Sequence, residues 1–180
     1  MSFIQEIKAL ASPTIVAISG YGGSGKSTLA KHLAKELNTN IVCIDSFAKD
    51  SQLKSYNYWN VMDFQRMERE VILPFLAKKE TITYGDFNWE NNQIDKHVTI
   101  NNTQLLIIEG VGLFRPELID YFSYKIWVDT SLEKSIAQGK KRDKEQYNKS
   151  LDEYWDGVWR KNDIECFEKY QPLAIADCIY

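Results

Sequence analysis

The stretch Gly20-Tyr21-Gly22-Gly23-Ser24-Gly25-Lys26-Ser27-Thr28 follows an apolar run at residues 14–19 and leads directly into a helical pattern at residues 26–37. It has the spacing Gly-x-x-x-x-Gly-Lys-Ser/Thr of a phosphate-binding loop. Glycines in such a loop let backbone N–H groups turn inward around phosphate oxygens, and the helix amino terminus adds partial positive charge. Because strand, loop and helix occur in this order, we favour a phosphate-binding loop over a glycine-rich turn with an exposed lysine.

The motif also assigns candidate roles to its residues. Lys26 is expected to reach the β- and γ-phosphates of ATP and to act in catalysis, and the Ser27 hydroxyl is expected to bind Mg²⁺. The residues expected to bind the nucleotide are Gly20, Gly22, Gly23, Ser24, Gly25, Lys26, Ser27 and Thr28.

Short apolar runs and helical periods alternate along the rest of the chain, as is typical of a parallel sheet covered by helices on both faces. Strands are expected at residues 14–19, 41–45, 105–109, 124–129 and 174–179. Helices are expected at residues 26–37, 63–78, 115–121, 132–147 and 151–170. The pattern predicts a three-layer α/β fold of the P-loop nucleoside triphosphate hydrolase type. Its five parallel strands, numbered in chain order, should be arranged 2-3-1-4-5.

Residues 80–102 interrupt this alternation. They predict a small excursion of short strands, at 81–84 and 98–100, around a polar centre. A length of 180 residues suits one domain with such an elaboration, and no linker rich in Gly, Ser or Pro divides the chain. We therefore expect a single domain over residues 1–180.

Composition narrows the class of protein. The 22 basic residues against 25 acidic ones give a formal net charge of −3, which lacks the basic excess of proteins that coat nucleic acid or anionic membranes. Cys43, Cys166 and Cys178 are an odd number at wide spacings, which disfavours zinc and disulfides. No apolar run approaches the about 18 residues of a membrane span. We expect a cytoplasmic protein with small-molecule partners, and leave open whether it forms a homo-oligomer.

Two carboxylates end strands that should flank the phosphate-binding loop. Asp45 lies at the carboxyl edge of the sheet, where ligands of open α/β folds bind. It could accept a proton from a substrate hydroxyl or hold Mg²⁺ through water, although a strand-end Asp can also cap a turn. Glu109 ends an apolar run with the form of a Walker B strand. We expect it near Ser27, as a direct or water-mediated Mg²⁺ ligand, with a structural cap as the alternative.

A basic run occupies the helix expected at residues 132–147. Such a run is often only the solvated face of a helix. An enzyme that transfers phosphate, however, needs cations over the transferring group, and the bidentate fork of arginine suits this role. Arg142 is therefore the candidate catalytic cation, with Lys141 and Lys140 behind it.

Two aromatic-rich segments, residues 56–59 and 84–89, are candidates for an acceptor pocket. Aromatic faces stack on bases or sugars, and an Asp beside them, here Asp86, can accept hydrogen bonds from hydroxyls. The alternative is that these rings belong mostly to the core.

Taken together, these motifs resemble the uridine kinase and phosphoribulokinase branch of the P-loop kinases over nearly the whole chain. Besides the phosphate-binding loop, the resemblance rests on Asp45-Ser46-Phe47, Phe64 to Lys78, Asp86-Phe87, Ile108-Glu109-Gly110, Ile126-Trp127-Val128-Asp129, Arg142-Asp143 and Ala176-Asp177.

This resemblance implies a kinase that uses ATP and Mg²⁺ to phosphorylate a hydroxyl group, most simply of a nucleoside such as uridine. It implies that Asp45 is the general base and that residues 131–149 form a lid. The excursion at residues 80–102 becomes the acceptor-site insertion, with Tyr84, Asp86 and Phe87 as acceptor-binding residues alongside Asp45.

The chain departs from the family pattern at the acceptor side. Uridine-cytidine kinases typically carry a Tyr directly before the Asp-Phe pair and a His-x-Arg a few residues later. Here Gly85 precedes Asp86, Tyr84 is displaced by one position, and residues 88–92 contain neither His nor Arg. The sequence thus favours phosphorylation of a hydroxyl more strongly than it favours uridine. A kinase for a sugar or vitamin-precursor alcohol, and an ATPase or regulatory module without an acceptor, stay as alternatives.

Overall fold

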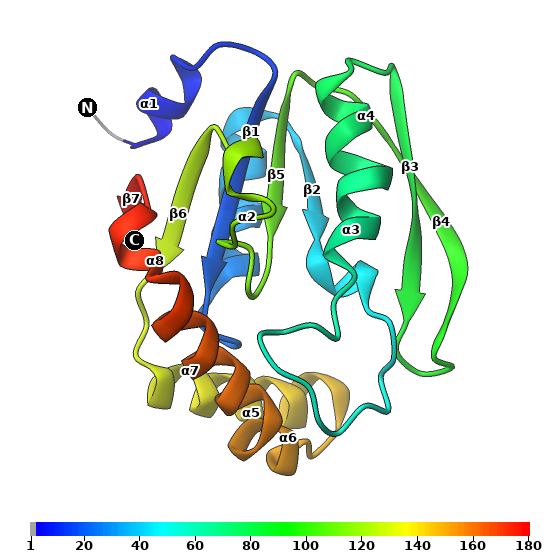
Figure 1. The fold of residues 1–180 in the computed structure, drawn as a ribbon, viewed down its shortest axis with the longest axis vertical. Helices are drawn as coiled ribbons and strands as arrows, with labels where there is room; N and C mark the ends of the chain where they lie inside the picture. The colour runs from blue at the N-terminus through cyan, green and yellow to red at the C-terminus, as the bar shows by residue number, and fades with distance from the viewer. Residues whose placement is uncertain (1–2) are drawn as a thin grey trace.

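A computed structural model describes residues 3–180 as a three-layer α/β protein (Figure 1). The central sheet has five parallel strands in the order β2-β5-β1-β6-β7. In chain order these strands are β1 Thr14–Gly20, β2 Asn40–Cys43, β5 Leu105–Glu109, β6 Tyr124–Val128 and β7 Cys178–Ile179. Numbered as sheet strands alone, they follow the predicted order 2-3-1-4-5, so the predicted fold class is confirmed.

The strand β1 lies at the centre of the sheet, and all seven of its residues are buried. It pairs with β5 on one side and with β6 on the other. A strand covered on both faces has no solvent side, which explains its continuous apolar run. The register pairs Ile18 with Glu109, so this carboxylate lies close to the start of the phosphate-binding loop.

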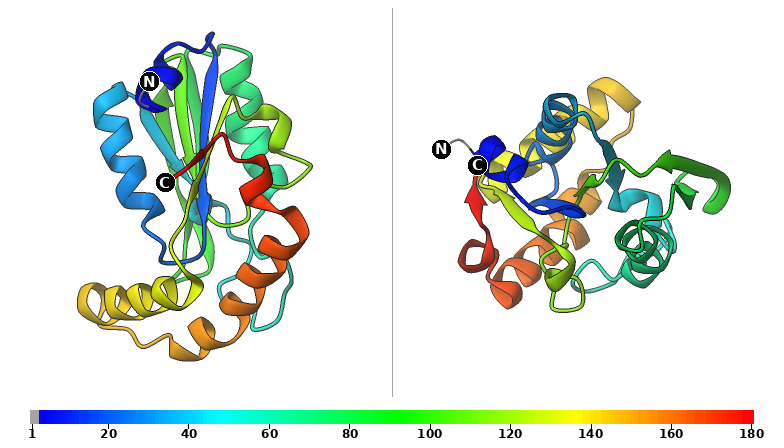
Figure 2. Two further views of the ribbon diagram at one scale, coloured as in Figure 1. Left: turned by 90° about the vertical axis from the view of Figure 1, so that its left-hand side faces the viewer. Right: turned by 90° about the horizontal axis from the view of Figure 1, so that it is seen from above.

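Helices cover both faces of the sheet (Figure 2). Helices α1 Phe3–Lys8 and α2 Lys26–Leu37 pack on one face, where Ile7, Leu29 and Leu33 are buried. On the other face lies a larger cluster, to which the segments around Phe47 and Met67 contribute. Helix α5 Leu132–Tyr147 lies across the carboxyl ends of the strands (Figure 1), with the bounds expected from the sequence.

The helix expected at residues 63–78 forms, but with a change of pitch. Asp63 accepts a hydrogen bond from the backbone N–H of Arg66 and caps α3 Phe64–Met67. A π-helical turn, η2 Glu68–Ile72, follows, and α4 Leu73–Leu76 completes the segment. Pro74 has no N–H to donate, and its ring would clash with the carbonyl four residues earlier in a regular helix. The wider π-turn lies just before this proline.

Several predicted boundaries were wrong. The strand expected at residues 41–45 ends at Cys43, and Asp45 lies in the 3₁₀ turn η1 Ile44–Phe47. Of the helix expected at 115–121, only the 3₁₀ turn η3 Ile119–Tyr121 forms. The helix expected at 151–170 is divided at Gly157 into α6 Asp152–Asp156 and α7 Val158–Tyr170.

The last expected strand, at residues 174–179, is shorter than predicted. Pro172 starts a short helix, α8 Pro172–Ile175, because its fixed φ suits a first helical turn. Only Cys178 and Ile179 then pair with β6. Within residues 3–180, no helix has both the length and the apolar character needed to cross a membrane.

The excursion at residues 80–102 is a two-stranded antiparallel hairpin, β3 Thr81–Asn88 and β4 Gln93–Asn101. It stands beside α3 and α4, apart from the main sheet (Figure 1). Its strands run further into the polar centre than the sequence indicated, and Asp95 accepts side-chain bonds from Asn88 and Asn91 that hold the turn. A bulge next to Asp86 shifts the register.

Candidate active site

The phosphate-binding loop lies at the carboxyl end of β1 and is held closely by α5. Gly23 has a left-handed φ of 79°, and a Cβ there would lie 2.2 Å from the backbone oxygen of Ser135. Only glycine fits both this conformation and this approach. The hydroxyl of Thr130 also donates to the backbone oxygen of Ser24, at 3.0 Å. Contacts within the protein therefore hold the loop backbone in this shape.

Polar groups of the loop are turned toward its interior. Lys26 is buried, and its ammonium donates to the backbone oxygen of Tyr21 at 2.7 Å. The Ser24 hydroxyl is buried and has no hydrogen-bond partner among the described residues. Buried polar groups without a partner are costly. A hydroxyl and an ammonium in this position suit phosphate oxygens.

Ser27 and Glu109 meet at the first turn of α2. The Ser27 hydroxyl donates to Oε1 of Glu109 at 3.0 Å, and Glu109 is buried. A hydroxyl and a carboxylate are the oxygen ligands that Mg²⁺ accepts when it keeps several waters and phosphate oxygens. Across residues 3–180, no three His, Cys, Asp or Glu side chains gather into a metal site of their own. The Ser27–Glu109 pair therefore fits an ion that phosphates help to hold.

Asp45 lies on η1, at the same edge of the sheet. The residue is exposed to solvent as a whole, yet its carboxylate sits among protein atoms that remove much of its hydration. Its pKa is raised to about 6 on balance, chiefly by this desolvation and next by the carboxylate of Glu109, while Lys26 and Arg142 act in the opposite direction. Asp45 thus shares one electrostatic environment with the groups predicted to bind phosphate and metal.

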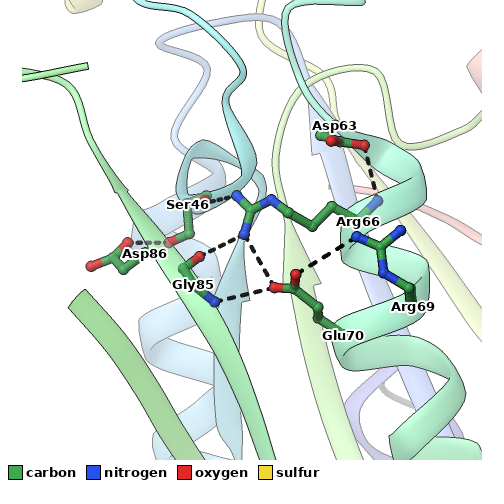
Figure 3. A network of polar contacts seen from close by, with 7 residues as sticks. All are labelled: Ser46, Asp63, Arg66, Arg69, Glu70, Gly85 and Asp86. Carbon is green, nitrogen blue, oxygen red and sulfur yellow. Dashed lines mark hydrogen bonds and ion pairs between the residues drawn. The ribbon is translucent and has the colours of Figure 1, made fainter. Parts of the chain in front are cut away.

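The acceptor side lies next to Asp45. Ser46 donates its hydroxyl to Oδ1 of Asp86 at 2.7 Å (Figure 3), and the exposed Trp89 donates its indole N–H to the backbone oxygen of Asp45 at 3.1 Å. The structure therefore brings Asp45 and Asp86 to one edge. Tyr84 and Phe87, also predicted to bind the acceptor, are both buried in the core.

The ring of Tyr84 stacks on Phe47 with centroids 5.4 Å apart. Burial raises the pKa of Tyr84 to about 12, so its hydroxyl stays protonated at neutral pH. Both rings thus lie in the core, and their part in acceptor binding stays a prediction.

Arg142 lies on the half of α5 that extends beyond the loop. Its guanidinium donates to Oδ1 of Asp143 through Nε at 3.0 Å and through Nη2 at 2.8 Å. Asp143 is buried, and its other oxygen accepts from the indole N–H of Trp155. The charge of Arg142 reaches Asp45, where it lowers the carboxylate pKa. Lys140 instead pairs with Asp156 at 2.6 Å.

One polar junction at the site was not predicted from the sequence. Asp163, buried on α7, accepts from the backbone N–H of Gly22 at 2.8 Å and from the indole N–H of Trp59 at 2.9 Å. Its neighbour Asn162 accepts from the backbone N–H of Trp59 and donates to the backbone oxygen of Tyr56. These two side chains join the phosphate-binding loop to the aromatic segment at residues 56–59.

Asp163 also has an altered pKa. Burial raises it to about 6, although Lys26 and the bonds from Gly22 and Trp59 oppose this rise. A sequence signal for the junction existed. Asp163 and Asn162 lie at helical spacing with Cys166 and Trp159, so they place polar groups on the inward stripe of a helix.

Comparison with known proteins places this geometry in a family. A family model described as an AAA domain matches residues 16–166, from β1 to α7. The chain belongs to the AAA domain family. Among curated relatives of this AAA domain, the uridine kinase of Clostridium tetani is 28% identical over 153 residues, which cover 78% of this chain and 72% of that protein. The uridine kinase of Alkaliphilus metalliredigens is 29% identical over 150 residues, covering 77% and 72%.

These relatives confirm the resemblance to uridine kinases, and they support the class of enzyme it implied, a phosphotransferase with an alcohol group as acceptor. Solved structures confirm the P-loop kinase fold of this AAA domain. A possible uridine kinase from Bacillus stearothermophilus has a TM-score of 0.74 at 18% identity, covering 99% of this chain and 95% of that chain. A candidate fructose transport system kinase from Silicibacter sp. TM1040 has a TM-score of 0.74 at 20% identity, covering 100% and 99%.

Proposed function

We propose that this protein is a cytoplasmic kinase that transfers the γ-phosphate of ATP to a hydroxyl of a small molecule, with a nucleoside of the uridine type as the acceptor. The observation that carries the proposal is the position of Asp45. Its carboxylate lies at the edge of the sheet, where Lys26, Glu109 and Arg142 all act on its pKa. The three free cysteines agree with a reducing compartment.

Different residues of the chain would bind the phosphates and the acceptor. The loop amides and Lys26 would hold the phosphates, while Asp45 accepts the proton of the attacking hydroxyl. A pKa of about 6 leaves most of this carboxylate ionised at pH 7, and it also lies closer to the working pH than an ordinary Asp, as suits a general base. Asp86, one hydrogen bond from Ser46, would accept a second hydroxyl of the acceptor.

Cations and a metal would complete the site. Mg²⁺, held by Ser27 and Glu109, would neutralise the charge that develops on the phosphate oxygens. Arg142 would add its charge from α5, and this requires the guanidinium to turn from Asp143 toward the transferring group. Helix α5 packs against Gly23, and Thr130 just before it bonds to Ser24, so this helix would help to shield bound phosphates from water, which would otherwise compete as acceptor.

The class of acceptor is argued separately from the kinase reaction. The names of the curated relatives favour a nucleoside. Gly85, in the place where uridine-cytidine kinases carry a Tyr, leaves a sugar or a vitamin-precursor alcohol as the competing acceptor.

The test is ADP release, measured with ATP and Mg²⁺ in the presence and absence of single acceptors. The panel holds uridine, cytidine, free sugars and pantothenate-like alcohols, and a Lys26→Met variant controls for contaminating activity. Release that depends on uridine or cytidine supports the proposal. Release that depends on another alcohol replaces the acceptor but keeps the kinase. Release without any acceptor indicates an ATPase, and no release from intact protein that binds ATP contradicts catalysis altogether.

A further inference from the structure

Arg66 is a buried arginine outside the phosphate-binding loop, with a side chain only 8% exposed. It projects from α3 between two other segments (Figure 3). Its Nη2 donates to the backbone oxygen of Ser46 at 2.6 Å, and its Nη1 donates to the backbone oxygen of Gly85 at 2.8 Å. The guanidinium also lies over the ring of Phe47, 4.5 Å from its centroid. A single cation therefore binds the turn η1 and the strand β3 to the same helix.

Glu70 completes this arrangement from the π-helical turn. Its Oε2 accepts from Nη1 of Arg66 at 3.2 Å and from the backbone N–H of Gly85 at 3.1 Å. Both backbone groups of Gly85 are thus held by one ion pair. Single π-turns occur frequently at functional sites, and here the turn follows directly after the helix that carries the arginine.

The residues that Arg66 holds are the neighbours of the two acceptor-side carboxylates. Ser46 follows Asp45 in the chain, and Gly85 precedes Asp86. The hydrogen bonds from Arg66 therefore hold the backbone from which the side chains of Asp45 and Asp86 extend. The direct bond from Ser46 to Asp86 adds a second connection across the same gap.

The space for the guanidinium depends on Gly85. A Cβ at this position would lie 3.2 Å from Nη1 of Arg66 and 2.6 Å from Cγ2 of Ile94. A larger residue would push against both groups. The absence of a side chain at position 85 and the presence of an arginine at position 66 are therefore parts of one arrangement.

We propose that Arg66 is a positioning residue of the acceptor site, which holds the Asp45 turn and the Asp86 strand at a fixed separation and so limits the acceptors that fit. This inference rests on the proposed kinase function. It goes beyond it by assigning the acceptor geometry to a buried residue that bonds to the backbone next to Asp45 and Asp86. A positioning residue affects the rate by keeping other groups in place, since misplacing reacting groups by about 1 Å can lower the rate about 100-fold.

The kinetic test compares Arg66→Gln and Arg66→Lys with Arg69→Gln. Arg69 is a matched control, because it lies on the same helical segment and also pairs with Glu70, but its side chain is 68% exposed. We expect Arg66→Gln to raise the acceptor KM by about tenfold or more and to lower kcat, while the affinity for a fluorescent ADP analogue stays within about twofold. Arg66→Lys should recover part of this loss. An acceptor KM equal to that of Arg69→Gln overturns the proposal.

A second measurement does not depend on activity. Amide hydrogen exchange, followed by NMR in native protein and in Arg66→Gln, reports where the structure loosens. We expect faster exchange at residues 46–47 and 84–87 and unchanged exchange in β1 and β5. Faster exchange throughout the chain, or no change anywhere, overturns the positioning role. If native protein shows no acceptor-dependent transfer, the proposed kinase function fails, and the exchange pattern alone decides whether Arg66 holds the two segments.

Discussion

The phosphate-binding loop and the acceptor side meet at one edge of the sheet, but the loop is one continuous segment and the acceptor side is assembled from three separate ones. Nine consecutive residues, Gly20 to Thr28, form the loop, and α5 and α7 then close around it. The acceptor side is assembled from η1, α3 and β3, which are separated by up to 40 residues in the contact between Ser46 and Asp86. Its segments are joined by a buried ion pair and by side-chain hydrogen bonds.

This difference bears on how each region tolerates change. The loop depends on the absence of side chains, because Gly23 touches the backbone of α5 and Gly22 faces Trp155. The acceptor side depends instead on a few polar side chains that join η1, α3 and β3. One fold can carry different functional sites, because function resides in the site rather than in the fold. Substitutions in or beside each region can test the two separately.

The largest effect is expected where the two regions meet. Replacing Asp45 with Asn removes the proposed proton acceptor, and general acid–base catalysis contributes about 10²- to 10⁴-fold. We expect kcat to fall by this factor in steady-state assays of acceptor-dependent ADP release. Binding of ADP, followed by calorimetry, should stay unchanged because the loop does not depend on this carboxylate. Native turnover in Asp45→Asn would remove Asp45 from the role of base.

The second largest effect is expected from Asp163, whose carboxylate supports the phosphate-binding loop. Burial raises the pKa of this group to about 6, above its ordinary value of 3.8, so the folded state favours the protonated form. Its stabilising contribution is therefore present below about pH 4 and is lost as the pH rises through about 6. At 1.36 kcal/mol per pKa unit, the difference amounts to about 3 kcal/mol.

Urea titrations between pH 4 and pH 7 provide the measurement. Over this range the free energy of unfolding of the native protein should decrease with rising pH by about 2 kcal/mol more than that of Asp163→Asn. Parallel pH curves for the two proteins would show that Asp163 titrates normally, and would contradict the burial argument.

A smaller effect is expected from the packing of α5 against α6. A Cβ added at Gly139 would lie 2.2 Å from the indole ring of Trp155. Overpacking of this kind costs about 1 to 3 kcal/mol, of which the better helix propensity of alanine recovers up to about 1 kcal/mol. We expect Gly139→Ala to lower the urea midpoint, with tryptophan fluorescence as the probe. An equal or higher midpoint would mean that Trp155 has room to move.

The smallest effect is expected from the surface ion pair of half-buried Lys140 with exposed Asp156. Pairs at the surface contribute about 0.2 to 1 kcal/mol and are screened by salt. Lys140→Ala should therefore change the free energy of unfolding by less than about 1 kcal/mol, and the difference should vanish in 1 M NaCl. A larger loss that persists in salt would place Lys140 in the structural support of the loop.

Much of the fold could be predicted because its signals are local. The strands β1 and β5 are largely apolar runs, and β6 is interrupted only by Lys125. Helix α5 has a clear start at Ser131, whose side chain accepts from the N–H of Lys134. Boundaries failed where tertiary contacts decide them. The short β7 depends on pairing with β6, and the break at Gly157 depends on where α6 and α7 pack.

In the candidate site too, the features with local sequence signals could be predicted and the others could not. The contact of Ser27 with Glu109 and the edge position of Asp45 follow from a motif and from strand order, because parallel strands bring their carboxyl ends together. The sequence left open whether Tyr84 and Phe87 belong to a pocket or to the core, since an aromatic ring suits both. The structure buries both rings, and their part in acceptor binding stays a prediction.

The phosphate-binding loop, the parallel sheet and the likeness to uridine kinases can all be read from the chain, because each is encoded in consecutive residues or in a simple period. The burial of Arg66 and Asp163, and the groups that they bind, emerge only once the chain is folded. A charged residue on a helix is ordinarily solvated. Whether it is instead enclosed depends on segments distant in sequence, here Ser46 and Gly85 for Arg66 and Gly22 and Trp59 for Asp163.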